Sequence, residues 1–356
     1  MTSKERVLAT LAHEKIDHVP VDYSANPEID KRLKTHLGLA ADDDDGLKLA
    51  LSVDYRYIFP PYRGPKLHAD IPERGVKVDN WGIHTRWIEH PAGGYWDYCD
   101  FPLKDADLET IANWPMPDPD DFDYSEIRQQ CEKYREYCVT IGGAGIPDII
   151  NSTGMIRSME QVLIDLALDD PAGFKFIDRR IDIFYEILTR ALEAAKGGID
   201  LLLLGEDLGT QIGPMISLEM FRKHFRPRHQ KFINLAKLFG IPVQIHSCGS
   251  SSWAFEDFIE MGITAVDTLQ PEAKNMSPEY LKKNFGGRLA FHGCISTAGP
   301  VATGTVKDTV DYCRRTLEIM MPGGGYCFSP THALQDNSPT ENVIAMYETA
   351  KKYGKY

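Results

Sequence analysis

The sequence predicts an α/β protein: a (β/α)8 barrel of the TIM type with an elaborated, aromatic-rich N-terminal region. Short β-rich runs alternate with long helical stretches from Tyr137 onward, which is typical of βα units on a parallel sheet. The chain has 356 residues, 43% of them hydrophobic, which is enough for a large core. We therefore expect one domain over residues 1–356. It would hold an N-terminal elaboration and the first barrel elements in 1–135, and regular βα units in 136–356.

The N-terminal part is the less regular one. We expect a helix at Ser3–Glu14, a strand at Val19–Asp22 and a helix at Pro27–Leu39, and we interpret the acidic run Asp42–Asp45 as a solvated loop. Residues 55–98 are rich in aromatic side chains, and the alternating stretch 82–88 is typical of a hairpin strand. These aromatic side chains would either form an apolar lid over the barrel mouth or pack in the core.

The regular part supplies six strands, and eight are needed to close a barrel. The six expected strands are Cys138–Gly142, Leu201–Leu204, Val243–His246, Ala265–Thr268, Leu289–His292 and Tyr326–Ser329. The clearest expected helices are Met155–Leu168, Ala172–Ala195, Leu218–Phe239, Trp253–Met261, Val306–Met321 and Pro339–Tyr353. Val19–Asp22 and one strand hidden in residues 50–90 would complete the barrel. A doubly wound open sheet is the alternative, although no GxGxxG motif follows the early strands.

Charge and composition exclude several classes of protein. Lys and Arg number 39 against 52 Asp and Glu, for a formal net charge of −13, which argues against binding to nucleic acid or to anionic lipid. No run of 18 apolar residues predicts a membrane span. The seven cysteines form no spaced disulfide framework and no secretory signal precedes them, so we expect a cytoplasmic protein with free thiols.

In a βα barrel, the active site lies where the strands end at their carboxyl side. Those ends carry an unusual concentration of metal-binding and proton-transferring residues: Glu206 and Asp207, His246 and Cys248, Asp267, His292 and Cys294, and Cys327 to His332. His246 and Cys248 are two residues apart in an extended segment, so their side chains point the same way. Zinc takes such nitrogen and sulfur ligands, and a catalytic zinc keeps one position open beside three protein ligands.

The residue patterns leave the third ligand open between His332, Cys327 and Cys294. Glu206 and Asp207 would bind metal, act as acid or base, or simply cap a helix, and Gly209 would let their loop fit closely. Asp267 has the same alternatives. A tight turn with a buried thiol is the competing interpretation of the segment 246–249.

The chain resembles the uroporphyrinogen decarboxylase superfamily, and within it the zinc- and corrinoid-linked methyltransferase branch. The resemblance covers nearly the whole chain, through segments such as LLLLGEDLGTQIG, VQIHSCGS, AVDTLQPEAKNM, LAFHGCIST and GGGYCFSPTHALQDNSPTEN. The arginine-rich motif with which the decarboxylases bind substrate carboxylates is absent, since residues 20–28 are PVDYSANPE. The branch's third metal ligand, a cysteine, aligns with His332.

The resemblance implies a corrinoid-dependent methyltransferase, the O-demethylase component of one-carbon metabolism. It would move a methyl group from a small methoxylated, aromatic substrate to the cobalt of cobalamin carried by a separate corrinoid protein. Zn²⁺ held by His246, Cys248 and His332, with Cys294 and Cys327 in reserve, would act as the Lewis acid. Glu206, Asp207 and Asp267 would be the catalytic residues.

Three alternatives stay open at this stage. The chain would instead be a methyl-corrinoid:thiol methyltransferase that activates a coenzyme M-like thiol, a metal-free decarboxylase of the same superfamily, or a non-catalytic corrinoid-binding protein. The methyl donor, the direction of transfer and the oligomeric state, a homodimer among the outcomes, are not determined by the sequence.

Overall fold

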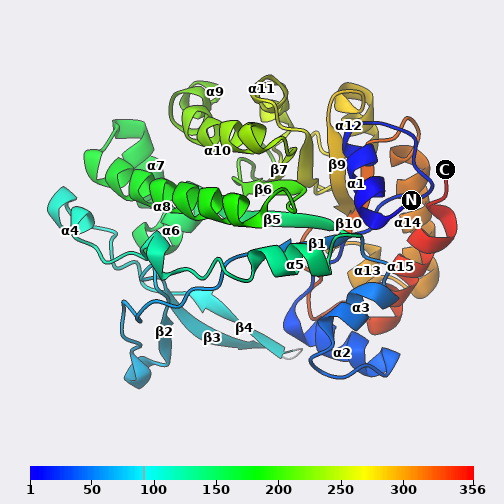
Figure 1. The fold of residues 1–356 in the computed structure, drawn as a ribbon, viewed down its shortest axis with the longest axis horizontal. Coiled ribbons are helices and arrows are strands. Elements are labelled where there is room, and N and C mark those ends of the chain that lie inside the picture. The colour runs from blue at the N-terminus through cyan, green and yellow to red at the C-terminus, as the bar shows by residue number, and fades with distance from the viewer. Residues whose placement is uncertain (91–92) are drawn as a thin grey trace.

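The computed structural model describes residues 1–90 and 93–356, and its centre is a curled sheet of seven parallel strands (Figure 1). The strands follow the order β1-β5-β6-β7-β8-β9-β10. Their bounds are Tyr55–Ile58 (β1), Cys138–Pro147 (β5), Leu201–Gly205 (β6), Val243–Ser247 (β7), Ala265–Thr268 (β8), Ala290–Ile295 (β9) and Tyr326–Pro330 (β10). All six strands predicted after Tyr137 are present, and β1 is the strand expected within residues 50–90. The sheet is that of a TIM-type barrel.

The segment 19–22, predicted as a strand, lies between the two edge strands of this sheet. Val21 forms a parallel bridge with Phe328 of β10, and the Phe328 amide donates to the carbonyl of Pro20 at 2.8 Å. On the other side, the amide of Asp54, just before β1, donates to the carbonyl of Val21 at 2.8 Å. Residues 19–22 therefore occupy the eighth position and connect β10 to β1; we call this connection the seam.

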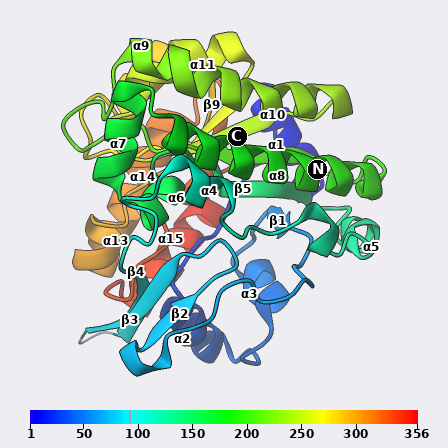
Figure 2. The ribbon, with the colours of Figure 1, turned by 90° about the vertical axis from the view of Figure 1, so that its left-hand side faces the viewer.

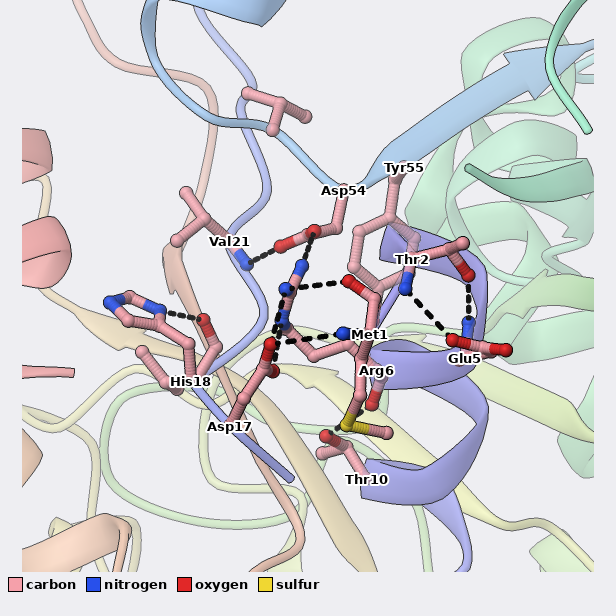
Figure 3. Close-up of polar contacts among 12 residues, drawn as sticks. Met1, Thr2, Glu5, Arg6, Thr10, Asp17, His18, Val21, Asp54 and Tyr55 are labelled. Carbon is pink, nitrogen blue, oxygen red and sulfur yellow. Dashed lines mark hydrogen bonds and ion pairs between the residues drawn. The ribbon is translucent and has the colours of Figure 1, made fainter. Parts of the chain in front are cut away.

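An ion-pair cluster stabilises the seam on the side where the barrel strands begin (Figure 3). The guanidinium of Arg6, on helix α1 (Ser3–Leu11), donates to Asp17 at 2.8 Å and to Asp54 at 2.7 Å. The other carboxylate oxygen of Asp54 accepts from the Val21 amide at 2.8 Å. One arginine thus ties α1, the segment 19–22 and the start of β1 together.

Helices surround the barrel. The others are α2 Pro27–Leu37, α3 Asp44–Ala50, α4 Leu108–Ala112, α5 Ile127–Lys133, α6 Asn151–Arg157, α7 Met159–Leu168, α8 Pro171–Ala195, α9 Leu218–Met220, α10 Arg226–Phe239, α11 Phe255–Met261, α12 Pro278–Phe285, α13 Pro300–Thr303, α14 Val306–Met320 and α15 Thr340–Tyr353. None of the helices in the described part of the chain is long and apolar enough to cross a bilayer.

Two predicted helices are interrupted, and α3 forms where a loop was expected. Ser158 has φ +63° and caps α7, so the helix predicted at 155–168 is split into α6 and α7. The helix predicted at 218–239 contains a π-helical turn at Phe221–Phe225. It ends two residues before Pro227, which lacks the amide hydrogen of a regular helix. Asp43 accepts from the Gly46 amide at 2.8 Å and so starts α3 inside the acidic run.

A small antiparallel sheet stands apart from the barrel, at the bottom of the views in Figures 1 and 2. It contains β2 (Val76–Val78), β3 (His84–His90) and β4 (Gly93–Tyr98), and β3 and β4 form the expected hairpin. Its aromatic side chains are largely exposed rather than buried in the core, and the most exposed are Trp87, Tyr95, Trp96 and Tyr98. Whether this sheet covers a substrate stays a prediction. Residues 91–92, which belong to the predicted aromatic segment, lie outside the described residues.

The barrel is closed at the amino ends of its strands, which we call the lower end. It is hollow at the carboxyl ends of its strands, which we call the upper end or mouth. The lower layer consists of the first inward-facing residues of the strands, packed against Val7 and Leu11 of α1; these strand residues are Tyr55, Cys138, Leu201, Ala265, Ala290 and Cys327. Helix α1 closes the barrel below this layer, and the room inside the barrel lies toward the carboxyl ends of the strands.

Candidate active site

Two loops meet at the upper end of the barrel, after β6 and after β7. A Cβ at Gly209 would lie 2.3 Å from the Ser250 amide nitrogen, and one at Gly249, where φ is +70°, would lie 2.1 Å from the Gly209 carbonyl oxygen. Only residues without a side chain allow the loops to approach this closely. The expected role of Gly209 is thereby confirmed, and the contact brings Asp207 beside Cys248.

Asp207, His246 and Cys248 converge into one cluster of potential metal ligands. One ligand atom from each of these three residues lies within 4.8 Å of the others. His246 Nε2 is 3.4 Å from Cys248 Sγ and 3.8 Å from Asp207 Oδ1, which also accepts from the Cys248 amide at 2.7 Å. Among the described residues, no other group of three His, Cys, Asp or Glu side chains is as close.

The cluster suits zinc. Nitrogen, sulfur and carboxylate oxygen are the zinc ligands found in proteins, and three of them leave a fourth position open. His246 Nδ1 is held by Asp267 Oδ2 at 2.9 Å, so Nε2 is the nitrogen left to face the cluster. A carboxylate behind a ligating histidine is the usual arrangement that fixes the ring's tautomer and orientation.

A chain of hydrogen bonds continues from this histidine across the barrel. Asp267 Oδ1 lies 2.8 Å from His292 Nδ1, and His292 Nε2 lies 3.0 Å from Asp22 Oδ2, which also accepts from the hydroxyl of Tyr57. The five side chains His246, Asp267, His292, Asp22 and Tyr57 come from β7, β8, β9, the seam and β1. The network therefore crosses from one side of the barrel mouth to the other.

Charge alternates along this chain, and the pKa values reflect it. Burial opposes ionisation of Asp267, but His292 and His246 together hold the pKa of its carboxyl well below its usual range. Burial likewise opposes protonation of His246 and His292, but neighbouring acidic groups, with Asp267 acting on both rings, raise the pKa of each imidazole well above its ordinary value. Burial raises the pKa of the Cys248 thiol, and His246 offsets this only in part.

The five side chains of this hydrogen-bonded network line a cavity of about 360 Å³ at the carboxyl ends of the strands. Its walls come from the seam and from strands all around the barrel: Asp22, Tyr23, Ser24, Tyr57, Ala144, Leu203, His246, Asp267, His292, Ser329, Pro330, Thr331, His332 and Ala333. A larger cavity of about 740 Å³ lies at the lower end, where Arg6, Asp17 and Asp54 already pair with one another. We place the candidate site at the smaller cavity because His246, one of the three clustered ligands, lines it together with Asp267 and His292.

The remaining predicted site residues lie in different surroundings. Glu206 is 1% exposed and accepts from the Ile149 and Ile150 amides at 2.7 and 3.1 Å, which caps the start of α6 and favours a structural role over a catalytic one. Its pKa is raised well above the ordinary value, first by burial and then by Asp148. His332 is exposed on the wall of the cavity and is not part of the close cluster.

Neither reserve cysteine lines the cavity. Gly293 and Cys294 both have positive φ, +125° and +65°, so the alternation of an extended strand is lost and the Cys294 side chain packs in the hydrophobic core. Cys327 belongs to the lower layer beside Tyr55, below the cavity.

Sequence reasoning missed two residues, Asp22 and Tyr57, and left His292 without a role. A histidine at a strand end was a visible signal for His292. The seam and β1 show no motif around Asp22 and Tyr57, and only the closed barrel places these residues beside His292, 270 positions away from Asp22 along the chain.

The comparisons with known proteins agree with this architecture. The model of the uroporphyrinogen decarboxylase (URO-D) family matches residues 104–353. The chain belongs to the URO-D family. A solved structure of a methyltransferase from Methanosarcina mazei matches this URO-D chain with a TM-score of 0.61 and 16% sequence identity, over 99% of each chain, which shows a shared fold. No curated protein matches the chain significantly.

Proposed function

We propose that this URO-D family member is a methyltransferase that moves a methyl group from a small methoxylated aromatic donor to the cobalt of a separate corrinoid protein. The observation that carries the proposal is the convergence of Asp207, His246 and Cys248 beside a cavity at the barrel mouth. The fold shared with a methyltransferase and the family-specific segments support it further.

The ligand set that the geometry favours is His246, Cys248 and Asp207, rather than the His332 that the resemblance implied. Zn²⁺ bound there would supply a Lewis acid for the negative charge that develops on the ether oxygen as its methyl group leaves. The protein's part is to orient these groups. Asp267 holds the His246 ring with Nε2 toward the cluster, and the Asp207 carboxylate fixes the Cys248 backbone by accepting its amide hydrogen.

The walls of the cavity suit a small, weakly polar donor. Ala144, Leu203, Pro330 and Tyr57 contribute apolar surface, which keeps water away from the reacting ether. His292, held between two carboxylates, keeps a proton close to the cavity wall.

A decarboxylase acting on a multiply carboxylated tetrapyrrole fits this site poorly. Among the described residues that line the cavity there is no Lys or Arg, and the carboxylates of such a substrate would need basic partners.

The decisive experiment measures metal content and methyl transfer together. We expect the purified protein to bind one equivalent of zinc and, with a cob(I)alamin-bearing partner, to demethylate a methoxylated aromatic compound. His246→Ala and Cys248→Ala should lose both the zinc and the activity, whereas Cys99→Ser, a free thiol far from the cluster in sequence, should keep both. Full activity after removal of the zinc would contradict the proposed mechanism. Formation of a thioether from methylcobalamin and a thiol, with no methoxylated donor consumed, would indicate the thiol methyltransferase instead.

The third ligand is tested by two further variants. Asp207→Ala should weaken zinc binding at least tenfold, and His332→Ala should leave it unchanged, as measured by competition with a chromogenic chelator. The reverse pattern would assign His332 as the ligand.

A further inference from the structure

Among the described strand residues, Tyr57 is the tyrosine that lines the cavity; Tyr23, directly after the seam, lines it as well. Tyr55 and Tyr57 are alternate residues of β1 and point the same way, with nearly parallel rings 6.3 Å apart. Tyr55 is 1% exposed in the lower layer, whereas Tyr57 is 42% exposed and lines the cavity. Tyr55 lies on one side of the Tyr57 ring, so the exposed area faces the mouth.

The Tyr57 ring is nevertheless held in place. Its hydroxyl donates to Asp22, which in turn bonds His292 and is anchored through its backbone carbonyl by the hydroxyl of Tyr347 at 3.1 Å. A ring fixed at one end and open on one face is a preorganised surface for stacking another ring, since little conformational freedom remains to be lost on binding.

The described polar groups around this ring offer an anionic ligand no Lys or Arg partner. Asp22 and Asp267 both line the cavity, and no Lys or Arg does so in the described part of the chain. Both nitrogens of His292 already serve these two carboxylates, and His246 Nδ1 serves Asp267. His332 is exposed at the rim of the cavity.

We infer that the methyl donor is an uncharged aromatic ether whose ring stacks on Tyr57, and that a carboxylate on the same ring is rejected. This inference rests on the proposed function, because it names the class of donor that the same site accepts. Tyr57 is then the residue that selects a ring, and the absence of a free basic partner among the described lining residues selects its charge.

The test is equilibrium binding to the zinc-loaded protein by isothermal titration calorimetry, with two probes that differ by one carboxylate: 2-methoxyphenol and 4-hydroxy-3-methoxybenzoate. We expect the uncharged probe to bind at least about tenfold more tightly. Tyr57→Leu should weaken its binding about threefold to tenfold, the range expected for one stacking contact. Tyr57→Phe, which keeps the ring, should stay close to wild type. Tyr98→Leu is the matched control, because Tyr98 is as exposed as Tyr57 but lies on β4, away from the cavity, and should have no effect.

Equal or tighter binding of the benzoate to the wild-type protein would overturn the inference, and so would the absence of binding of either probe. A folded Tyr57→Leu variant with unchanged affinity would also overturn it. The comparison of the two probes needs no variant, so a folding failure of Tyr57→Leu does not remove the test. Methyl transfer is not measured, so a protein that shows the stated preference but transfers no methyl group refutes only the proposed function.

Discussion

Asp267 touches two imidazole rings and lies at the centre of the site. Its two oxygens bond His246 Nδ1 at 2.9 Å and His292 Nδ1 at 2.8 Å. Asp267→Asn would remove the charge that orients both rings, and carboxylates behind a metal-bound histidine are typically worth 10- to 100-fold in metal affinity. We therefore expect zinc binding to weaken by about that factor in a chelator competition assay.

The control for this variant is Asp311→Asn, because Asp311 is exposed on α14 and forms an ion pair with Lys307. Zinc affinity that is the same in both variants would show that Asp267 does not support the metal ligand.

His229 on α10 gives the protein a pH-dependent stability that is independent of the cavity. Burial lowers its pKa to about 4, and its Nδ1 lies 3.1 Å from the Phe225 carbonyl oxygen. In the unfolded chain this histidine has the ordinary pKa of about 6.5, so it becomes protonated below that pH. In the folded protein it becomes protonated only near pH 4. Its contribution is therefore complete above pH 6.5 and falls, by up to about 3 kcal/mol, as the pH drops through that window.

Urea unfolding between pH 4 and pH 7.5 checks this expectation. The free energy of unfolding should fall less steeply with acidification in His229→Gln than in the wild type. Glu206, 3.5 Å from His229 Nε2, is present in both proteins. Parallel curves for the two proteins would contradict the assignment.

At the scale of single residues, the sequence predicts what is local. His246 and Cys248 are two positions apart on one strand, so their convergence follows from strand geometry alone. Asp207 is predicted as a mouth residue that would bind metal, act as an acid or base, or cap a helix. The sequence does not choose among these roles, because the distance of Asp207 from Cys248 depends on how tightly Gly209 and Gly249 pack. Tyr57 and Asp22 depend on the closure of the barrel, which no local pattern encodes.

At the scale of elements, the strands were easier to predict than the helix interruptions. Apolar runs such as Leu201–Leu204 identify buried strands, whereas the split at Ser158 requires a positive φ that only the tertiary packing imposes. The π-helical turn before Pro227 is equally hard to predict. A proline indicates that the helix is irregular nearby, but the type of irregularity depends on the packing of the neighbouring turns.

The seam gives a prediction about element stability. Asp54 is 4% exposed, and its charge is balanced by Arg6. Arg6→Ala leaves a buried carboxylate without its partner, so we expect a loss of about 2–4 kcal/mol, somewhat reduced because Arg6 itself is partly exposed. Denaturant unfolding measures this, with Arg128→Ala on the exposed side of α5 as the control, for which we expect a change within about 0.5 kcal/mol. An equal effect of both variants would show that the cluster does not hold the seam.

At the scale of the whole molecule, zinc binding should couple to global stability. A ligand that binds only the folded protein stabilises it by about 2.7 kcal/mol at 100 times its dissociation constant. We expect the thermal midpoint to rise by a few degrees with added zinc in the wild type, measured by differential scanning calorimetry. Cys248→Ala should show no rise, and the same rise in that variant would place the bound metal elsewhere.

Seven of the eight strands expected for a closed barrel are present, because the alternation of strands and helices persists over the last 220 residues. The segment Val19–Asp22, expected as the eighth, forms no regular strand. Within it, only Val21 forms a bridge.

That short segment has one more consequence. Asp22 is its last residue, so this weakly paired segment also carries an end of the hydrogen-bond chain that orients His246 in the candidate site. If the wall opens there, even briefly, Asp22 leaves His292 and Tyr57 at the same moment. The frequency of such opening, which amide exchange at Asp22 and Phe328 would report, sets how long the site stays assembled between turnovers.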